Sequence, residues 1–399
     1  MAQPAVTCSI AFATGPSAVP TWTDVTSYLQ AFTWSSGRQT ERDRFEAGTG
    51  TLVLDNPDRR FEPGYASGAY YPNVVPLKRV RVRAVWNSVT YDLFHAYVEN
   101  WGLDYPDLDA NALVRVVDGQ GLLMDAGVTG SPVSTDGATR ISTVLDAAGW
   151  PAADRTLGVS QNTVPPSVLE AESAMQHLLK VAEAENGVIF IAKDGKLTFQ
   201  NRHARLLPTL SSIISLGPGG SAHYQRVGID YDNTRLFTAV AYSREPQGDD
   251  DEPVTQLLEN ATGVATYLRR TLSKSGLLNA VDADTYRAAS HDLERQLAPG
   301  MRVVGLDLDA EDGPSGPAVL WPQLLGRELS DRITVIKPPP GGGAAITQVS
   351  NIERRTMAWD ANGGVWAISW SLSPADTTAY WMLADATYSV LGSTTKLGY

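Results

Sequence analysis

The sequence predicts a β-rich α+β protein in which two β-rich segments bracket a helix-plus-hairpin α/β unit. Short apolar–polar alternations with a period of two recur in the first hundred residues and again after Tyr224. One strong helical period lies between these two stretches. The chain of 399 residues also contains 35 Gly and 24 Pro, which supply the frequent turns that short strands need.

Composition excludes several classes of protein. With 43% hydrophobic and 19% charged residues, the chain is expected to fold rather than remain disordered. No heptad or Gly-X-Y period runs through it, which excludes a fibrous protein. A net charge of −12 gives no basic footprint for nucleic acid. A chain of this length is expected to form two or three domains.

Cysteine content and the N-terminal residues limit the context further. Cys8 is the only cysteine, so an intramolecular disulfide and a cysteine-based zinc site are excluded, and the residue is predicted to be a buried apolar filler. The first residues have neither the positive region nor the long apolar region of a Sec signal. No stretch approaches 18 consecutive apolar residues, so no transmembrane helix and no membrane insertion are expected.

The first β-rich segment contains several short strands separated by turn residues. Asn87-Ser88 is predicted to turn one strand into the next as a hairpin. Asp55-Asn56-Pro57-Asp58 is predicted to end another strand. The even spacing is typical of a small barrel or a sandwich. Strands are expected at residues 6–12, 51–54, 80–86, 89–94 and 113–117.

The middle of the chain changes character. A short helical patch, Ile141–Ala148, lies within a stretch rich in Ser, Pro, Gly and Thr. The clearest helix is predicted to start at a capping box of Ser167 and Glu170, to run through Ala182, and to end before Gly187. Asp194-Gly195 between apolar runs then predicts a hairpin of residues 188–191 and 197–199.

Strands return in the last part of the chain. A second helix is expected from Asp282 or Asp284 through Leu297, where Pro299 stops it. The acidic run 248–252 and the Pro/Gly run 337–343 are interpreted as exposed loops, and a Trp/Tyr-bearing tail covers residues 380–399. Strands are expected at residues 227–231, 236–242, 303–308, 332–336, 347–354 and 366–372.

No constellation of residues predicts catalysis. H-E-x-x-H, G-x-S-x-G and the P-loop motif do not occur, and the five histidines lack the spacing of metal ligands. We therefore predict no catalytic residue, no cofactor-binding residue, no cofactor and no metal site. The segments 104–109, 249–252 and 307–313 are acidic, and 217–221 is glycine-rich; all four are interpreted as loops or strand ends rather than as a glycosidase pair, a calcium loop or an anion cradle.

A series of short motifs carries a resemblance to a known family. In order they are W-T-D-V-T (22–26), S-G-R (36–38), E-A-G-T-G-T-L (46–52), L-D-N-P-D-R-R-F-E-P (54–63) and Y-P-N-V-V-P (71–76). This series resembles the opening domain of minor tail proteins of long-tailed phages that infect actinobacteria, which look like baseplate hub (tail tip) proteins. Phe94-His95-Ala96 departs from the usual Phe-x-Gly of that family.

The resemblance continues along the chain. L-D-A-A-G-W-P (145–151), the helix, E-N-G-V-I-F (185–190) and D-G-K-L (194–197) are similar to the α/β insertion of such hubs. L-S-D-R-I-T-V (329–335) is similar to their G-D-x-V-x-V strand, with Ser330 in place of the Gly. N-I-E-R (351–354) and W-S-L-S-P (370–374) follow in the expected order.

The resemblance implies a domain order and an assembly. It implies an N-terminal β-barrel hub domain at 1–118, an α/β insertion domain at 119–222, and a second β-barrel hub domain with one helix and a C-terminal tail at 223–399. It further implies a homotrimer whose two barrels per chain alternate around an axis, so that the ring has a pseudo-sixfold surface that docks on a hexameric tail tube. We expect a non-enzymatic structural protein of the virion, located at the tail tip and assembled in the host cytoplasm.

The expected partners follow from that position. They are a distal tail protein, the tail tube, the tape measure protein, and tail fibre or receptor-binding proteins. DNA is expected to pass through the ring without specific binding, and an acidic lumen would keep phosphate from adhering. Two other functions remain open from the residues: a tail-associated glycan hydrolase that uses an Asp/Glu pair, and a glycan-binding receptor module that uses exposed Trp and Tyr.

Overall fold

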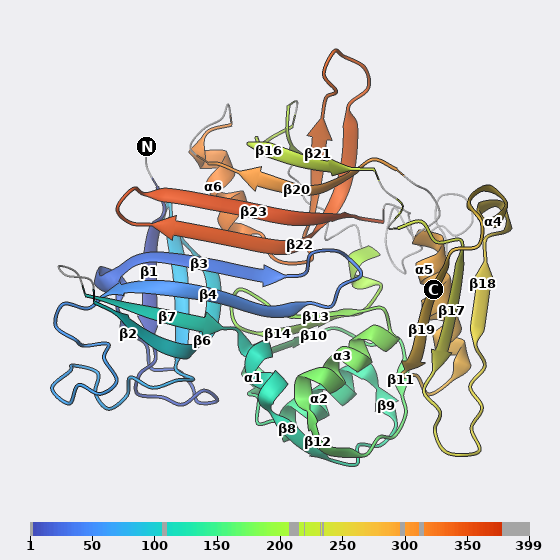
Figure 1. Cartoon of the computed structure of the whole chain (residues 1–399), viewed down its shortest axis with the longest axis horizontal. Helices are drawn as coiled ribbons and strands as arrows, with labels where there is room; N and C mark the ends of the chain where they lie inside the picture. Colours follow the sequence, from blue (N-terminus) through green and yellow to red (C-terminus); the bar gives the residue numbers. More distant parts are fainter. Residues whose placement is uncertain are drawn as a thin grey trace.

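A computed structural model describes residues 3–105, 110–206, 215–218, 220–231, 233, 235–295, 300–310 and 315–376. The predicted β-rich α+β class is confirmed: strands dominate both ends of the chain, and helices gather in the middle and in a peripheral unit (Figure 1). The tail at 380–399, the end of the helix predicted to reach Leu297, and Pro299 lie outside the described residues.

The N-terminal strands form where the alternation predicted them. Asn87 and Ser88 both have positive φ, at 46° and 66°, which is the geometry of a tight hairpin turn. Cys8 is fully buried, and burial raises the pKa of its thiol to about 12. The strands are β1 (Ala5–Ile10), β2 (Thr23–Asp24), β3 (Leu29–Gly37), β4 (Glu46–Asp55), β5 (Arg79–Trp86), β6 (Val89–Asp104) and β7 (Asn111–Val117).

The middle of the chain is the α/β unit, drawn in teal and green in Figure 1. The hairpin around Asp194-Gly195 is confirmed as β13 (Val188–Ile191) and β14 (Leu197–Gln200). The other elements are α1 (Gly119–Asp125), β8 (Gly127–Gly130), β9 (Thr135–Asp136), α2 (Gly137–Ala147), β10 (Arg155–Leu157), β11 (Thr163–Val164), β12 (Leu169–Ser173) and α3 (Ala174–Ala184), with short 3₁₀ turns η2 (Ala152–Asp154) and η3 (Ala204–Leu206). A further 3₁₀ turn, η1 (Thr26–Tyr28), lies between β2 and β3.

The predicted start of the long helix is wrong. Residues Leu169–Ser173 form β12, which pairs with β8, and Ala171 has a positive φ of 54°. The helix begins at Ala174, where the Ser173 side chain accepts a hydrogen bond from Gln176 N at 3.4 Å. The S-x-x-E pattern at Ser167 therefore lies in extended chain, because pairing with a distant strand overrides a local capping signal.

The last part of the chain contains an inserted unit and the closing strands. The insert forms a small three-stranded sheet, with β17 central and α5 against it, at the right of Figure 1. Its elements are β17 (Ala239–Arg244), β18 (Gln256–Glu259), α4 (Ala261–Tyr267), β19 (Thr271–Leu277) and α5 (Asp282–Arg295). The others are β15 (Ser215–Leu216), β16 (Arg226–Asp230), β20 (Arg302–Leu308), α6 (Pro317–Gly326), β21 (Arg332–Lys337), β22 (Ile346–Asp360) and β23 (Val365–Pro374).

The two β-rich segments join in a single sheet. Its 13 strands follow the order β16-β20-β23-β22-β3-β4-β7-β6-β5-β1-β2, with β21 beside β22 and β15 beside β21. The junction is the antiparallel pairing of β22 with β3, from Arg354 opposite Gly37 to Asp360 opposite Ala31. None of the sheets in the described part of the chain closes on itself, so two separate barrels are not confirmed. The physical reason is the pairing of β22 with β3, because each β-rich segment would need its own one of these two strand edges to close into a barrel.

The large sheet contains the same five-stranded unit twice. In chain order, β3, β4, β5, β6 and β7 pair as β3-β4-β7-β6-β5; β16, β20, β21, β22 and β23 pair as β16-β20-β23-β22-β21. Both units have a bulge at the same place. In the pairing of β6 with β7, Glu99 is skipped between the pairs Val98–Val116 and Asn100–Arg115. In the pairing of β22 with β23, Glu353 is skipped between the pairs Ile352–Leu372 and Arg354–Ser371.

The turns before β5 and β21 match as well. Leu77 and Ser330 have positive φ angles of 63° and 74°. Leu77 N donates to Val98 O at 2.7 Å, and Ser330 N donates to Ile352 O at 2.8 Å. Ser330 thus occupies a left-handed backbone position, which glycine adopts most readily. The repeat is structural, since few of the paired positions carry the same residue.

One apolar core serves both copies of the repeat. It contains Phe32, Trp34 and Phe94 from the first and Ile352 and Trp370 from the second, all at most 4% exposed. The Trp321 ring of α6 is fully buried, 6.2 Å from the Trp86 ring and 5.4 Å from the Trp366 ring, measured between centroids. A second core joins α1, α2, α3 and β13 to β17 and α5. Among the described residues, no helix is long and apolar enough to cross a membrane.

Replacing Gly37 tests the junction between the two copies. Gly37 has a φ of +111°, and a Cβ atom there would lie 2.2 Å from the Glu353 carbonyl oxygen. We expect Gly37→Ala to lower the free energy of unfolding by at least about 2 kcal/mol in chemical denaturation, since both backbone strain and overlap oppose it. Gly15→Ala, where the new methyl group meets no atom within 4 Å, is the control and is expected to change it by less than about 0.5 kcal/mol. Equal effects of the two substitutions would contradict this account.

Candidate functional site

Glu353 organises a cluster of buried charged contacts. The bulge in β22 turns its side chain inward, where its carboxylate is fully buried. Arg38 Nε donates to Glu353 Oε2 at 2.7 Å, and Arg205 Nη1 donates to Oε1 at 2.6 Å. Arg38 follows β3 and Arg205 lies in η3, so one carboxylate holds together the β3–β4 loop, the α/β unit and the second repeat.

Hydroxyl groups complete this cluster. Ser373 Oγ on β23 donates to Glu353 Oε1. Arg205 Nε donates to Ser330 Oγ at 2.9 Å, and Ser330 Oγ donates in turn to Gln200 Oε1 at 2.6 Å. Burial alone would raise the pKa of the Glu353 carboxyl, but Arg205 and Arg38 together hold this pKa well below its ordinary value. The carboxylate is therefore charged at neutral pH.

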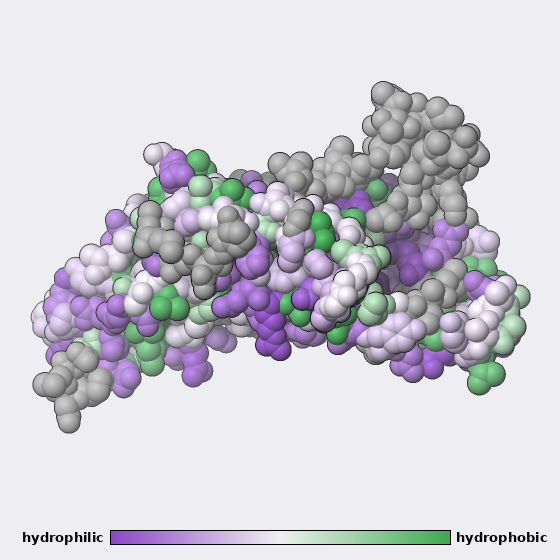
Figure 2. All heavy atoms as spheres, turned by 90° about the horizontal axis from the view of Figure 1, so that it is seen from above, coloured by the Kyte–Doolittle hydropathy of each residue, from purple (hydrophilic) through white to green (hydrophobic). Residues whose placement is uncertain are grey.

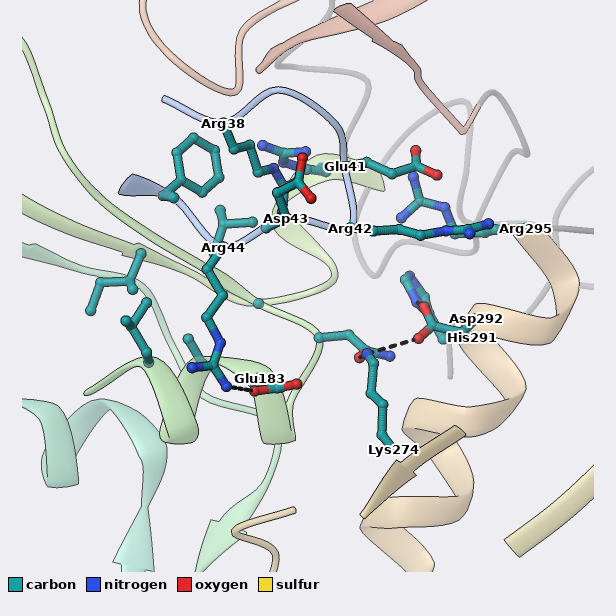
Figure 3. A pocket seen from close by; sticks show the side chains of 18 of the residues that line it. Arg38, Glu41, Arg42, Asp43, Arg44, Glu183, Lys274, His291, Asp292 and Arg295 are labelled. Carbon is teal, nitrogen blue, oxygen red and sulfur yellow. Dashed lines mark hydrogen bonds and ion pairs between the residues drawn. The ribbon is translucent and has the colours of Figure 1, made fainter. Parts of the chain in front are cut away.

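A cavity of about 330 Å³ opens beside this cluster (Figure 3). It lies between the β3–β4 loop, the end of α3, β19 and the end of α5. Its charged lining residues are Arg38, Glu41, Arg42, Asp43, Arg44, Glu183, Arg205, Lys274, Asp292 and Arg295. Figure 3 shows the Arg42 and Arg295 side chains approaching each other, with His291 beside Asp292.

Most charges around the cavity are neutralised within the chain. Arg44 pairs with Glu183. Lys274 Nζ donates to Asp292 Oδ2 at 3.1 Å and to Asn186 Oδ1 at 2.8 Å. Asp292 is buried, which alone would raise the pKa of its carboxyl, but Lys274 and the neighbouring donors lower that pKa overall. The Lys274–Asp292 pair lies within the peripheral unit, and the hydrogen bond from Lys274 to Asn186 links that unit to the end of α3.

His291 is the exception in this lining. Its ring is 5% exposed, and neither ring nitrogen has a hydrogen-bond partner among the described residues. Burial lowers the pKa of His291, which therefore lines the cavity as a neutral imidazole at neutral pH. Nδ1 lies 3.5 Å from Asp292 Oδ1, beyond an ordinary hydrogen bond.

The acidic segments singled out in the sequence do not come together as one described site. Asp104 ends β6, Asp307 lies on β20, and Asp251 forms an ion pair with Arg244 that lowers the pKa of its carboxyl to about 2. Residues 106–109 and 311–313 of those segments, and Gly219 of the glycine-rich segment, lie outside the described residues. Across the part of the chain that the structure describes, no three His, Cys, Asp or Glu side chains are placed to hold a metal ion.

The exposed face of the large sheet has a distinct composition. Many of the side chains that point away from the core on its central strands are short and uncharged, and they follow one another across both repeats. Arg354 on β22 and Arg115 on β7 are charged residues among them. A shallow depression of about 350 Å³ lies on this face, with Glu99 and Arg115 of opposite charge at its margin. The short side chains are Thr33, Ser35, Thr49, Thr51, Thr356, Ala358, Ser369 and Ser371.

The hydrophilic and hydrophobic residues are interspersed over the elongated face seen from above (Figure 2). The exposed large apolar side chains include two at the end of β6 and one that directly follows β16. Leu103 is 39% exposed, Tyr105 is 50% exposed and Tyr231 is 68% exposed. Sequence reasoning did not single out these residues, because only the sheet order shows that they lie at edges.

Comparison with solved structures shows the fold. The chain is similar to a tail protein from Neisseria meningitidis MC58, with a TM-score of 0.59, 12% identity, and coverage of 92% of this chain and 96% of that one. It is also similar to the 43 kDa tail protein of prophage MuSo2 from Shewanella oneidensis, with a TM-score of 0.55, 10% identity, and coverage of 93% and 98%.

A more distant likeness extends to a VgrG complex. The chain aligns with a Francisella PdpA–VgrG complex structure at a TM-score of 0.51 and 8% identity, covering 92% of this chain and 52% of that chain. No family model matches the sequence, and no curated protein matches it significantly. The chain therefore has the fold of phage tail proteins.

Replacing the central carboxylate tests the charged cluster. Glu353→Gln leaves two buried guanidinium groups facing a neutral amide, so we expect the free energy of unfolding to fall by about 3–5 kcal/mol at pH 7. Glu183→Gln breaks the solvent-exposed pair with Arg44 and is expected to cost less than about 1 kcal/mol.

The same pair of variants gives a pH dependence. Because the folded-state pKa of Glu353 lies below its ordinary value of 4.5, its contribution to stability is complete above that pH and is lost as the pH falls further. Wild type should lose more stability than Glu353→Gln between pH 5 and pH 3 (about two units spanning the ordinary glutamate pKa). Parallel pH profiles of the two proteins in urea unfolding would contradict the assignment.

Proposed function

We propose that this chain is a structural protein of a phage-type tail, a hub at the tail tip that assembles as a trimeric ring around the DNA exit path. The observation that carries the proposal is the fold, which the chain shares over nearly its full length with two tail proteins. No catalytic step is assigned to it. The proposed location is the virion, at the tail tip, after assembly in the host cytoplasm.

The internal repeat supports a ring of three chains. Each chain carries two copies of one five-stranded unit, arranged side by side in one sheet. Three chains would place six such units around an axis, and a six-unit ring matches the symmetry of a hexameric tail tube. The proposed partners are accordingly the tail tube and a distal tail protein on one side, with the tape measure protein and fibre or receptor-binding proteins completing the tip.

The strand count gives the size of such a ring. If four strands of each unit line the wall, 24 strands at a spacing of about 4.8 Å give a circumference of about 115 Å before any strand tilt. This corresponds to a diameter of about 37 Å between backbones, and strand tilt would widen it. The passage is then wide enough for a DNA duplex to move through with side chains lining the wall.

The exposed face of the central strands is the proposed wall of that passage. Its short Thr, Ser and Ala side chains carry no cationic group. Of the two arginines on this face, Arg115 has Glu99 beside it, and Arg354 donates hydrogen bonds to Ser35 and Gln39. Protein affinity for DNA depends on Lys and Arg that neutralise phosphates. A wall of mostly small neutral side chains would let DNA slide without adhering, and an acidic lumen is not needed for this.

Mass measurement tests the assembly. Light scattering of the full chain is expected to give three times the monomer mass of 42.9 kDa, alone or together with tail-tube protein. A three-subunit ring should also be visible by electron microscopy. A monomer under both conditions, or absence of the protein from purified tails, would rule out the ring.

A charge placed on the proposed wall tests the passage. Thr33 is exposed at the centre of the face, so Thr33→Lys would put three ammonium groups into each ring. We expect rings of this variant to retain duplex DNA in a salt-dependent manner, whereas wild-type rings do not. Val19→Lys adds the same charge at a site that is 89% exposed and outside the sheet, and it is expected to retain no DNA. Equal retention by the two variants would contradict this placement of the wall.

A further inference from the structure

We propose that copies of this chain join edge to edge, by antiparallel pairing of residues 100–105 at the end of β6 in one copy with β16 and Tyr231 of the next copy. This interface rests on the proposed ring and specifies how the ring closes. It follows from the internal repeat, since the chain already contains one example of the same junction, between β22 and β3.

The internal junction provides the template. Beyond the bulge at Glu353, β22 has β23 on one side and β3 on the other, with Met357 opposite Trp34 and Trp359 opposite Phe32. Met357 and Trp34 are buried at 0% and 4% exposure. The Phe32 and Trp359 rings stack with centroids 5.9 Å apart. The junction therefore combines a backbone ladder with continuous packing of the core face.

The corresponding edges elsewhere in the chain have no strand beside them. Beyond the bulge at Glu99, β6 pairs with β7 only, because its pairing with β5 ends at Tyr97. At the other end of the sheet, β16 pairs with β20 only. Within the described ranges, both strands thus present one row of backbone donors and acceptors to no other strand, a situation that proteins resolve by pairing or covering the edge.

The repeat fixes the register of the proposed pairing. Counted from the bulges, Leu103 corresponds to Met357 and Tyr105 to Trp359. In the second repeat, Val227 of β16 pairs with Leu306 of β20, and in the first repeat, Phe32 of β3 pairs with Leu52 of β4. Val227 therefore corresponds to Phe32, and Ile229, two residues further along, corresponds to Trp34. Transferring the pairs of the template places Leu103 opposite Ile229 and Tyr105 opposite Val227.

Side-chain chemistry agrees with this register. On the core-facing side, β6 offers Trp101, Leu103 and Tyr105, and the partner edge offers Val227, Ile229 and Tyr231. Leu103, Tyr105 and Tyr231 are 39%, 50% and 68% exposed in the single chain, although Met357 and Trp359, the template counterparts of Leu103 and Tyr105, lie in or beside the core. Pairing would cover this apolar surface, which is the main source of stability in such interfaces.

The charged residues of the two edges avoid one another in the same register. Asp104 falls opposite Gly228, and Asp230 falls opposite Gly102, so no two carboxylates face each other across the strands. A shift by one residue would turn every apolar side chain to the other face of the sheet. The contact is head to tail, because β6 of each copy meets β16 of the next, and such contacts close into rings when the rotation permits.

Cysteine cross-linking in the full chain tests the interface. Leu103→Cys combined with Ile229→Cys would bring two thiols to directly opposed positions, whose Cβ atoms lie about 5 Å apart in antiparallel strands. Under mild oxidation we expect covalent dimers and trimers, with each single variant remaining monomeric on a non-reducing gel. The native Cys8 is fully buried and stays in place. The control combines Leu103→Cys with Tyr267→Cys. Tyr267 lies on α4 and is 39% exposed, like Leu103, so this double variant should form no covalent dimers or trimers.

A second pair of variants separates the interface from the ring. Ile229→Asp should weaken trimer formation at least tenfold in light scattering, whereas Tyr267→Asp should leave it unchanged, with both variants checked for an intact fold by circular dichroism. A trimer that neither cross-links through the 103–229 pair nor responds to Ile229→Asp would overturn this interface while leaving the proposed ring standing. A protein that is monomeric alone and with tail-tube protein would overturn both.

Discussion

The pairing of β22 with β3 is the contact on which the rest of the structure depends. These strands are more than 300 residues apart in the sequence, from Arg354 opposite Gly37 to Asp360 opposite Ala31. Their ladder turns two β-rich segments into one sheet and one core. The close approach also explains Gly37, since any side chain there would overlap the Glu353 backbone. Loop-closure entropy opposes such a distant contact, and the buried aromatic side chains on both strands offset that cost.

The Glu353 cluster is built on that pairing. The bulge that places Glu353 inside the molecule also lets Arg38 and Arg205 reach it from two other segments. A buried carboxylate is costly to desolvate, and here two guanidinium groups from two other segments offset that cost. The corresponding Glu99 in the first repeat is exposed, which is consistent with an edge where the covering strand is missing from the single chain.

The repeat connects architecture with the proposed role. A single chain contains the junction once, between β22 and β3. The end of β6 and the strand β16 are the two halves of a second junction, which would form between chains. Stability within the chain and assembly between chains would then use the same register and the same kind of packing. The inserted unit of β17, β18, β19, α4 and α5 replaces the short β3–β4 loop of the first repeat, so it adds surface without disturbing the order of the strands.

The sequence by itself determined the local structure. Alternation located most strands, Asn87-Ser88 and Asp194-Gly195 located two hairpins, and the composition gave the β-rich class, because these features depend on neighbours within a few residues. It misplaced the start of α3, where pairing of β12 with β8 prevails over the capping pattern at Ser167, and it did not anticipate α1, α4 or α6.

Tertiary structure alone decided the order of the strands, the repeat and the candidate interface. Nothing in the local pattern distinguishes Leu103 from Leu54, for example: both lie on apolar–polar alternations, yet one is 39% exposed and the other fully buried. The difference arises because Leu54 has strands on both sides whereas Leu103 lies at an edge. Which strands become edges depends on pairings between residues hundreds of positions apart, and those pairings are selected by the packing of the whole core.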